Sequence, residues 1–62
     1  MPMDYRQAAK LIRKHGGKFV RHGASHDIFE TADGQEISLP RHKDEDISKG
    51  VERDIKKKLG LL

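Results

Sequence analysis

The sequence predicts an α+β fold in the order helix, three antiparallel strands, helix. Hydrophobic residues recur at helical spacing toward both ends of the chain. Between them lie short stretches with β-branched and aromatic residues, separated by glycine-containing turns. Residues 1–62 are enough for one domain with a thin core, so all five elements are expected to pack as a single unit.

The first helix is expected from about Asp4 to His15. Asp4 is a suitable N-cap, and Gln7 three residues later completes a capping box. The paired glycines Gly16 and Gly17 end the helix, one of them as a left-handed C-cap. The apolar face consists of Tyr5, Ala8, Ala9, Leu11 and Ile12.

The three strands are expected at residues 18–22, 26–31 and 35–39. Gly23 lies in the first turn, and the Asp33-Gly34 pair in the second turn is a hairpin signal. Phe19 and Phe29 are interpreted as core residues. Pro40 ends the sheet because it has no N–H to donate to a strand ladder.

The register of the second hairpin decides which strand face is buried. A two-residue loop would group His26 and Ile28 with the third-strand residues Ile37 and Leu39. A three-residue loop with a left-handed Gly34 would group a different set on the core face, namely Phe29, Thr31, Ile37 and Leu39. We expect the second register, because it buries the larger ring and leaves the ionisable imidazole of His26 on the open face.

The second helix is expected from Ser48, a plausible N-cap, to about Leu59, with Gly60 as its C-cap. It follows a charged loop at residues 41–46. The apolar stripe is Val51, Ile55, Leu59 and Leu62. The outer side carries Lys49, Arg53, Lys56 and Lys57. Two favourable pairs four residues apart are expected, Glu52–Lys56 and Asp54–Lys58.

Each helix has one apolar stripe, so both helices are expected to cover the same face of the sheet and leave the other face open. This α-β-β-β-α arrangement is that of the double-stranded-RNA-binding domain. The thirteen Lys and Arg residues against ten Asp and Glu residues favour phosphate-bearing or acidic partners. There is no cysteine, no apolar leader and no stretch that could span a bilayer, so a cytoplasmic protein is expected.

The order of short motifs along the whole chain resembles the HicA toxins of type II toxin–antitoxin modules. The resemblance rests on Gly-Gly, Phe-Val-Arg, Ser-His, Asp-Gly, Ile-Ser-Leu-Pro-Arg-His and a basic helix that ends in Lys-Lys-Leu-Gly-Leu. It implies an endoribonuclease that cleaves mRNA and is neutralised by a HicB-type antitoxin. RNA carries its own nucleophile, so the reaction is expected to need no metal and no cofactor. One departure is Ala24 at the position before Ser-His that is usually glycine; here the glycine is Gly23.

The resemblance implies that His26 is the catalytic residue. Active-site support is expected from Gly23, Ser25, Arg21 and His42: Ser25 matches the family motif directly, Arg21 precedes the turn, and His42 follows the third strand, where it could lie at the same end of the sheet as His26. A histidine titrates near neutral pH and can act as general base on the ribose 2′-hydroxyl. If the strand is regular, Ser25 points to the other face and is no orienting partner for His26. The residues expected to bind RNA are Lys18, Arg21, Arg41, Lys49 and Arg53.

A metal site is not expected, because His22 and His26 would lie roughly 13 Å apart on an extended strand. With both phenylalanines assigned to the core, RNA recognition is expected through phosphate and shape rather than base stacking. Two other readings stay open: a non-catalytic RNA-binding module of the same fold, and a protein-interaction domain that uses the open sheet face with Ile28.

Overall fold

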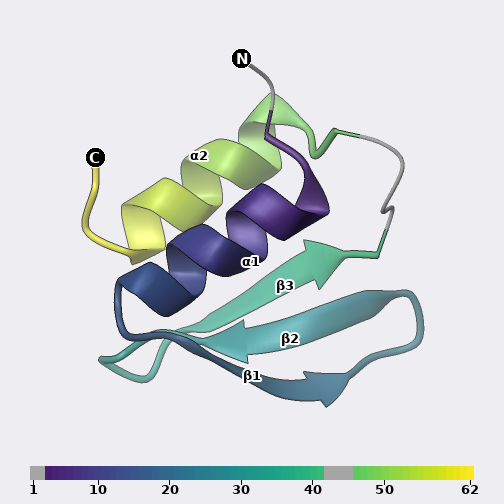
Figure 1. The fold of residues 1–62 in the computed structure, drawn as a ribbon, viewed down its shortest axis with the longest axis horizontal. Coiled ribbons are helices and arrows are strands. Elements are labelled where there is room, and N and C mark those ends of the chain that lie inside the picture. The colour runs from purple at the N-terminus through teal and green to yellow at the C-terminus, as the bar shows by residue number, and fades with distance from the viewer. Residues whose placement is uncertain (1–2, 42–45) are drawn as a thin grey trace.

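A computed structural model of the protein describes residues 3–41 and 46–62 (Figure 1). The elements follow the predicted order, and both helices lie on one face of a three-stranded antiparallel sheet with β2 in the centre. Their bounds are α1 Tyr5–Lys14, β1 Lys18–His22, β2 His26–Glu30, β3 Glu36–Pro40 and α2 Lys49–Lys58. The predicted α+β class is confirmed.

The predicted helix ends are confirmed at both helices. In α1 the Asp4 side chain accepts the backbone N–H of Gln7, and the Gln7 side chain accepts the backbone N–H of Asp4, which completes the capping box. The Ser48 hydroxyl caps α2 by accepting the N–H of Val51. Capping of this kind satisfies backbone donors that the first turn of a helix leaves unpaired.

The three-residue hairpin between β2 and β3 is also confirmed. Thr31 and Gln35 close the loop with a 2.8 Å backbone hydrogen bond, and Gly34 has the predicted left-handed φ of 90°. Phe29 therefore pairs with Ile37, and both side chains face the helices. The third strand is shifted by one residue from its predicted bounds: Pro40 still belongs to β3, where it lies opposite His26.

Strand β1 contains a bulge at Val20 that the sequence did not predict. Phe19 lies opposite Phe29, but Arg21 lies opposite Ile28, so one extra residue is accommodated between them. An extra residue reverses the alternation of side chains beyond it. Phe19 consequently faces the helices, Arg21 faces the open side, and His22 faces the helix side again.

The core lies between the two helices and the inner face of the sheet. Its buried hydrophobic residues are Ala8, Ala9, Ile12, Phe29, Ile37, Leu39, Ile47 and Ile55. Ile47, just before α2, was not predicted. The expectation that Phe19 and Leu62 are buried is wrong. Phe19 is 38% exposed because β1 is an edge strand whose inner face extends past the helices, and Leu62 is 70% exposed beyond the last turn of α2.

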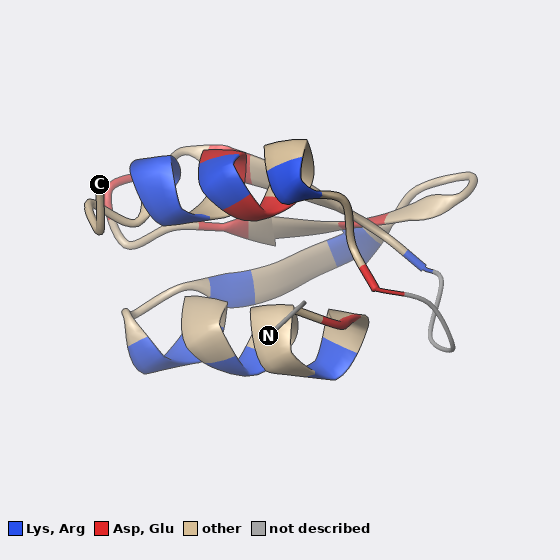
Figure 2. Ribbon diagram, turned by 90° about the horizontal axis from the view of Figure 1, so that it is seen from above, with Lys and Arg blue, Asp and Glu red and all other residues tan. Residues whose placement is uncertain are grey.

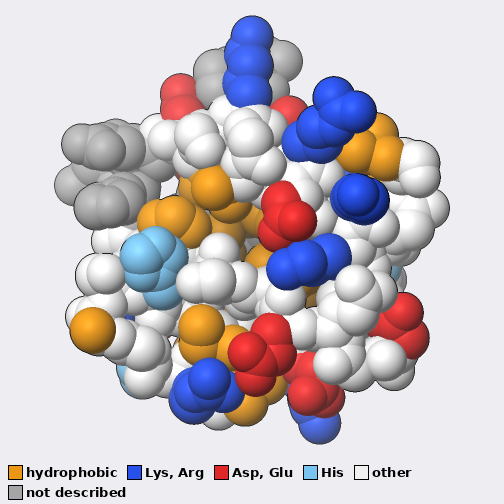
Figure 3. All heavy atoms as spheres, turned by 180° about the vertical axis from the view of Figure 1, so that it is seen from behind, with side chains coloured by type: hydrophobic (Ala, Val, Ile, Leu, Met, Phe, Trp, Pro, Cys, Tyr) orange, Lys and Arg blue, Asp and Glu red, His pale blue; other side chains and the backbone are white. Residues whose placement is uncertain are grey.

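The surface of α2 carries both predicted ion pairs, Lys56–Glu52 at 3.5 Å and Lys58–Asp54 at 3.2 Å. Basic and acidic side chains are interspersed over the side of the molecule seen from behind (Figure 3). Among the described residues, no helix has both the length and the apolar character needed to cross a membrane.

Candidate functional site

The turn between β1 and β2 is closed by the backbone of Gly23 and His26. The N–H of Gly23 donates to the carbonyl oxygen of His26 at 2.6 Å. A Cβ at position 23 would lie only 2.8 Å from that same oxygen, so a side chain there would collide with the backbone. The glycine of this turn is therefore required at position 23, and Ala24 is exposed at the tip.

His26 begins β2 and its side chain is exposed to solvent on the open side of the sheet. The Oγ of Ser25 lies 3.0 Å from Nδ1 of His26, within hydrogen-bonding distance. The expectation that Ser25 would point away from the imidazole is wrong. Ser25 belongs to the turn rather than to a regular strand, so strand alternation does not apply to it.

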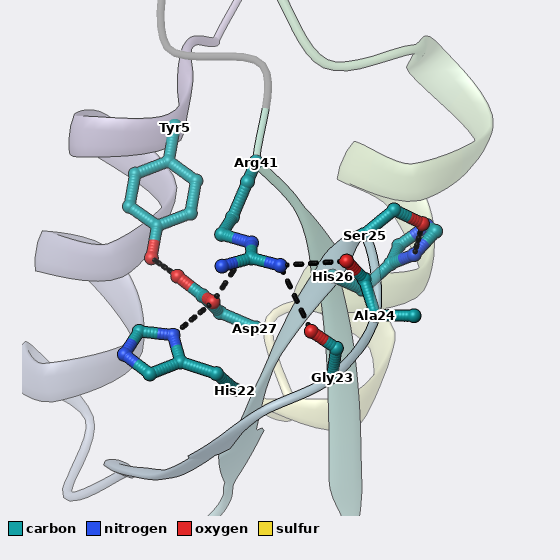
Figure 4. A network of polar contacts seen from close by, with 8 residues as sticks. All are labelled: Tyr5, His22, Gly23, Ala24, Ser25, His26, Asp27 and Arg41. Atoms are coloured by element: carbon teal, nitrogen blue, oxygen red, sulfur yellow. Dashed lines mark hydrogen bonds and ion pairs between the residues drawn. The ribbon is translucent and has the colours of Figure 1, made fainter.

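A second cluster of polar side chains surrounds Asp27, the next residue along β2 (Figure 4). The Asp27 side chain is only 5% exposed and faces the helices. The Tyr5 hydroxyl of α1 donates to Oδ2, and Nδ1 of His22 donates to Oδ1 at 2.8 Å. Figure 4 shows the His26 ring directed away from this cluster, toward Ser25.

Arg41 joins the buried carboxylate to the turn. Its Nε lies 3.3 Å from Oδ1 of Asp27, and one terminal guanidinium nitrogen donates to the carbonyl oxygens of Gly23 and Ala24 at 2.8 and 2.9 Å. The backbone N–H of Arg41 also donates to the carbonyl oxygen of Ser25. Arg41 therefore fixes the backbone that carries Ser25 and His26.

The network shifts the pKa values of two of its members in opposite directions. Burial and the hydrogen bond to Asp27 raise the pKa of Tyr5 to about 12. Burial opposes the charge of Asp27, but hydrogen bonds from Tyr5 and His22 and the charges of His22 and Arg41 outweigh it and lower the carboxyl pKa. Asp27 is therefore a buried carboxylate whose charge is stabilised by Tyr5, His22 and Arg41.

Comparison with protein families gives a match over residues 5–61 to the HicA toxin of bacterial toxin–antitoxin systems. The chain belongs to this family. The predicted resemblance is thus confirmed, and a HicA toxin implies an antitoxin partner. No curated protein and no solved structure matched the chain in the two other comparisons.

In this HicA toxin the predicted site residues separate into two groups. Gly23, Ser25, His26 and Arg41 converge on the β1–β2 turn. Arg21 lies on the open side, opposite Ile28, but its guanidinium is 3.4 Å from the exposed carboxylate of Glu36, at the end of β3 away from His26.

The remaining predicted residues are not brought to the turn. Lys18 lies at the far end of β1, opposite Glu30. Lys49 and Arg53 belong to α2, which covers the other face of the sheet from His26. His42 lies outside the described residues. Within residues 3–41 and 46–62, no group of three or more histidine, cysteine or acidic side chains could hold a metal ion.

The cluster around Asp27 was missed in the sequence, although the predicted register contained a signal for it. That register placed residue 27 on the same face as Phe29 and Thr31. A carboxylate on a buried face requires donors around it. The sequence did not show which residues donate to Asp27. Tyr5 is 22 residues away, and His22 faces the helix side only because of the bulge at Val20.

Proposed function

We propose that this HicA toxin is a metal-independent endoribonuclease that cleaves mRNA with His26 as general base. Family membership supports a toxin, and RNA supplies its own nucleophile in the 2′-hydroxyl group. One positioned base and a few cations therefore suffice for strand cleavage, and general base catalysis typically contributes about 10²–10⁴-fold. A HicB-type antitoxin would neutralise the toxin by covering the β1–β2 turn.

In the proposed reaction, Nε2 of His26 accepts the proton of the ribose 2′-hydroxyl. The 2′-oxygen forms a bond to the adjacent phosphorus, and the bond between phosphorus and the 5′-oxygen breaks. The leaving oxygen takes a proton from water or a protein acid. The products are a 2′,3′-cyclic phosphate and a 5′-hydroxyl end. Arg21, on the same side of the sheet, would leave its exposed pair with Glu36 to stabilise the charge on the phosphate oxygens.

The observation that carries this proposal is the contact between Ser25 and an exposed His26. When Nδ1 carries the proton and donates to Oγ of Ser25, Nε2 presents its lone pair to solvent, as a general base requires. The turn that holds Ser25 is itself fixed by Arg41. Catalytic groups gain efficiency when such contacts hold them in place.

The direct test is incubation of the purified protein with mRNA in excess EDTA. Wild type should fragment the RNA and His26→Ala should not, whereas Ser25→Ala should be slowed with its folding unchanged. The new 3′ ends should be 2′,3′-cyclic phosphates, and the new 5′ ends should be hydroxyl groups. RNA binding without cleavage by the wild type would instead support a non-catalytic RNA-binding module.

His22 needs the same test, because its Nδ1 is fixed by Asp27 and its side chain is 67% exposed. This is also an arrangement in which an imidazole can transfer protons. His22→Ala should retain cleavage if His26 is the base. If cleavage survives in His26→Ala and disappears in His22→Ala, the catalytic base is His22, on the helix side of the sheet. That result would contradict the proposal.

A further inference from the structure

An open groove of about 760 Å³ runs between α1 and β1, on the helix side of the sheet and apart from His26. Its lining is mainly apolar and aromatic, with contributions from Tyr5, Phe19 and Phe29. The imidazole of His22 also lines it. The proposed reaction at His26 makes no use of this groove.

The rim of the groove on α1 is cationic. Arg6, Lys10 and Arg13 are exposed and line the groove, and they follow one another at intervals of four and three residues on one side of the helix. They span about 10 Å along the helix axis at 1.5 Å per residue. Such a row of positive charges can follow a chain of phosphates.

The positive charge of α1 is not offset within the helix. Residues Tyr5–Lys14 include no acidic side chain, and among the described residues none of Arg6, Lys10 and Arg13 forms an ion pair. In Figure 2, the charged positions of α1 are all basic, whereas α2 carries both basic and acidic positions. The one carboxylate in the groove, Asp27, is already surrounded by Tyr5, His22 and Arg41.

Phe19 provides a rigid aromatic surface on the opposite side of the groove. Its ring packs edge-on against Phe29, with centroids 5.6 Å apart, and against His22 at 4.8 Å. It nevertheless remains 38% exposed. A ring that is held by two neighbours and open to solvent costs little entropy when a planar ligand stacks on it.

We propose that this groove binds one unpaired nucleotide of a single-stranded RNA, with the base against Phe19 and the flanking phosphates along α1. An aromatic wall next to a row of cations matches a planar base joined to phosphates. A second copy of the chain does not fit this pattern, because it would bring further positive charge. The choice of RNA as ligand rests on the proposed ribonuclease function.

The test measures binding of a fluorescein-labelled, single-stranded 2′-O-methyl oligoribonucleotide, which lacks the free 2′-hydroxyl and cannot be cleaved. Phe19→Leu should weaken binding by roughly 5- to 150-fold, the usual effect of losing one base–aromatic stack. The separate variant Phe19→Tyr should bind the oligonucleotide as the wild type does, since the aromatic face is retained. A duplex of the same sequence should show no dependence on Phe19, because its bases are stacked inside.

The contribution of the α1 cations to binding is tested by comparing Lys10→Gln with the matched control Lys57→Gln. The control removes one exposed positive charge from α2 instead of α1. Lys10→Gln should reduce the slope of log affinity against log salt by about 0.7, the value for one phosphate contact with a single strand. Lys57→Gln should leave that slope unchanged.

Binding of the uncleavable oligonucleotide separates this inference from the proposed catalysis. If wild type binds it through Phe19 and Lys10 but fails to cleave mRNA, the groove assignment stands and the ribonuclease assignment falls. If Phe19→Leu and Lys10→Gln bind it as tightly as wild type, the groove assignment is refuted. Unchanged oligonucleotide binding with a weakened antitoxin complex would also refute it, by identifying a protein-binding groove.

Discussion

Replacing Asp27 by asparagine should markedly destabilise the fold. The carboxylate accepts hydrogen bonds from Tyr5 and His22 and pairs with Arg41 at 3.3 Å. A hydrogen bond to a charged group contributes about 1.5–3 kcal/mol. Full loss of a buried pair costs roughly 3–5 kcal/mol, but His22 is 67% exposed and Arg41 34% exposed, so water replaces part of the interaction. We expect a loss of about 2–3 kcal/mol in the free energy of unfolding.

That loss is large for this chain, whose total stability should be roughly 3–9 kcal/mol on a per-residue basis. The melting temperature should fall by about 8–24 °C, since 1 kcal/mol corresponds to about 4–8 °C in small domains. Circular dichroism during thermal and urea unfolding measures both quantities. Asp54→Asn is the matched control, because it removes the same charge from an exposed pair with Lys58 and should cost about 0.5 kcal/mol or less.

The pH dependence of stability tests whether the charge of Asp27 causes the loss of stability in Asp27→Asn. The pKa of Asp27 is lower in the folded protein than in the unfolded chain, so its contribution is fully present above the unfolded value of about 4 and is lost as pH falls through the folded value. The stability difference between wild type and Asp27→Asn should therefore be constant near neutral pH and shrink in acid. A difference that persists unchanged at about pH 2, or that is absent at neutral pH, would refute the reasoning.

Three further predictions concern single residues. The absorbance of tyrosinate reports Tyr5 alone because the chain has one tyrosine. It should titrate with a midpoint near 12 in the wild type and with a lower midpoint in Asp27→Asn, where burial still raises the pKa but the carboxylate no longer does. The stability that Tyr5 contributes should be intact below pH 10 and lost as pH rises toward 12. Gly23→Ala should reduce both stability and mRNA cleavage, because its methyl group would displace the backbone of His26. Phe29→Ala should cost about 3–5 kcal/mol in chemical unfolding, as for other fully buried rings.

Each of these predictions has a control within the chain. A Tyr5 midpoint that does not move in Asp27→Asn would mean that the hydrogen bond between them does not form in solution. Ala24→Gly places the change at the exposed tip of the same turn and should leave cleavage intact, so equal effects at positions 23 and 24 would argue against the close approach. Phe19→Ala should cost clearly less than Phe29→Ala, and equal losses would contradict the exposure of Phe19.

Much of the fold could be predicted from the sequence, because local signals agreed with one another. The capping box at Asp4, the hairpin at Gly34 and the burial of Phe29 each depend on residues close in sequence or on simple alternation. The family resemblance was also visible, and the match over residues 5–61 confirms it. These features needed no knowledge of long-range packing.

What could not be predicted depends on irregular backbone or on distant contacts. The bulge at Val20 has no marker such as glycine, yet it decides which way His22 points. The pairing of Tyr5 with Asp27 joins the first helix to the central strand. The position of Ser25 beside His26 follows from the turn, where the periodicity of a strand no longer holds.

The single extra residue in β1 decides which side chains of this short hairpin face each side of the sheet. Because of it, Arg21 faces the side of His26 while its neighbour His22 faces the groove. The core is unaffected, since the edge strand contributes no residue to its fully buried part. Insertion or loss of one residue at this edge would thus be a low-cost way for such a toxin to exchange which side chains meet each ligand, without rebuilding the protein around them.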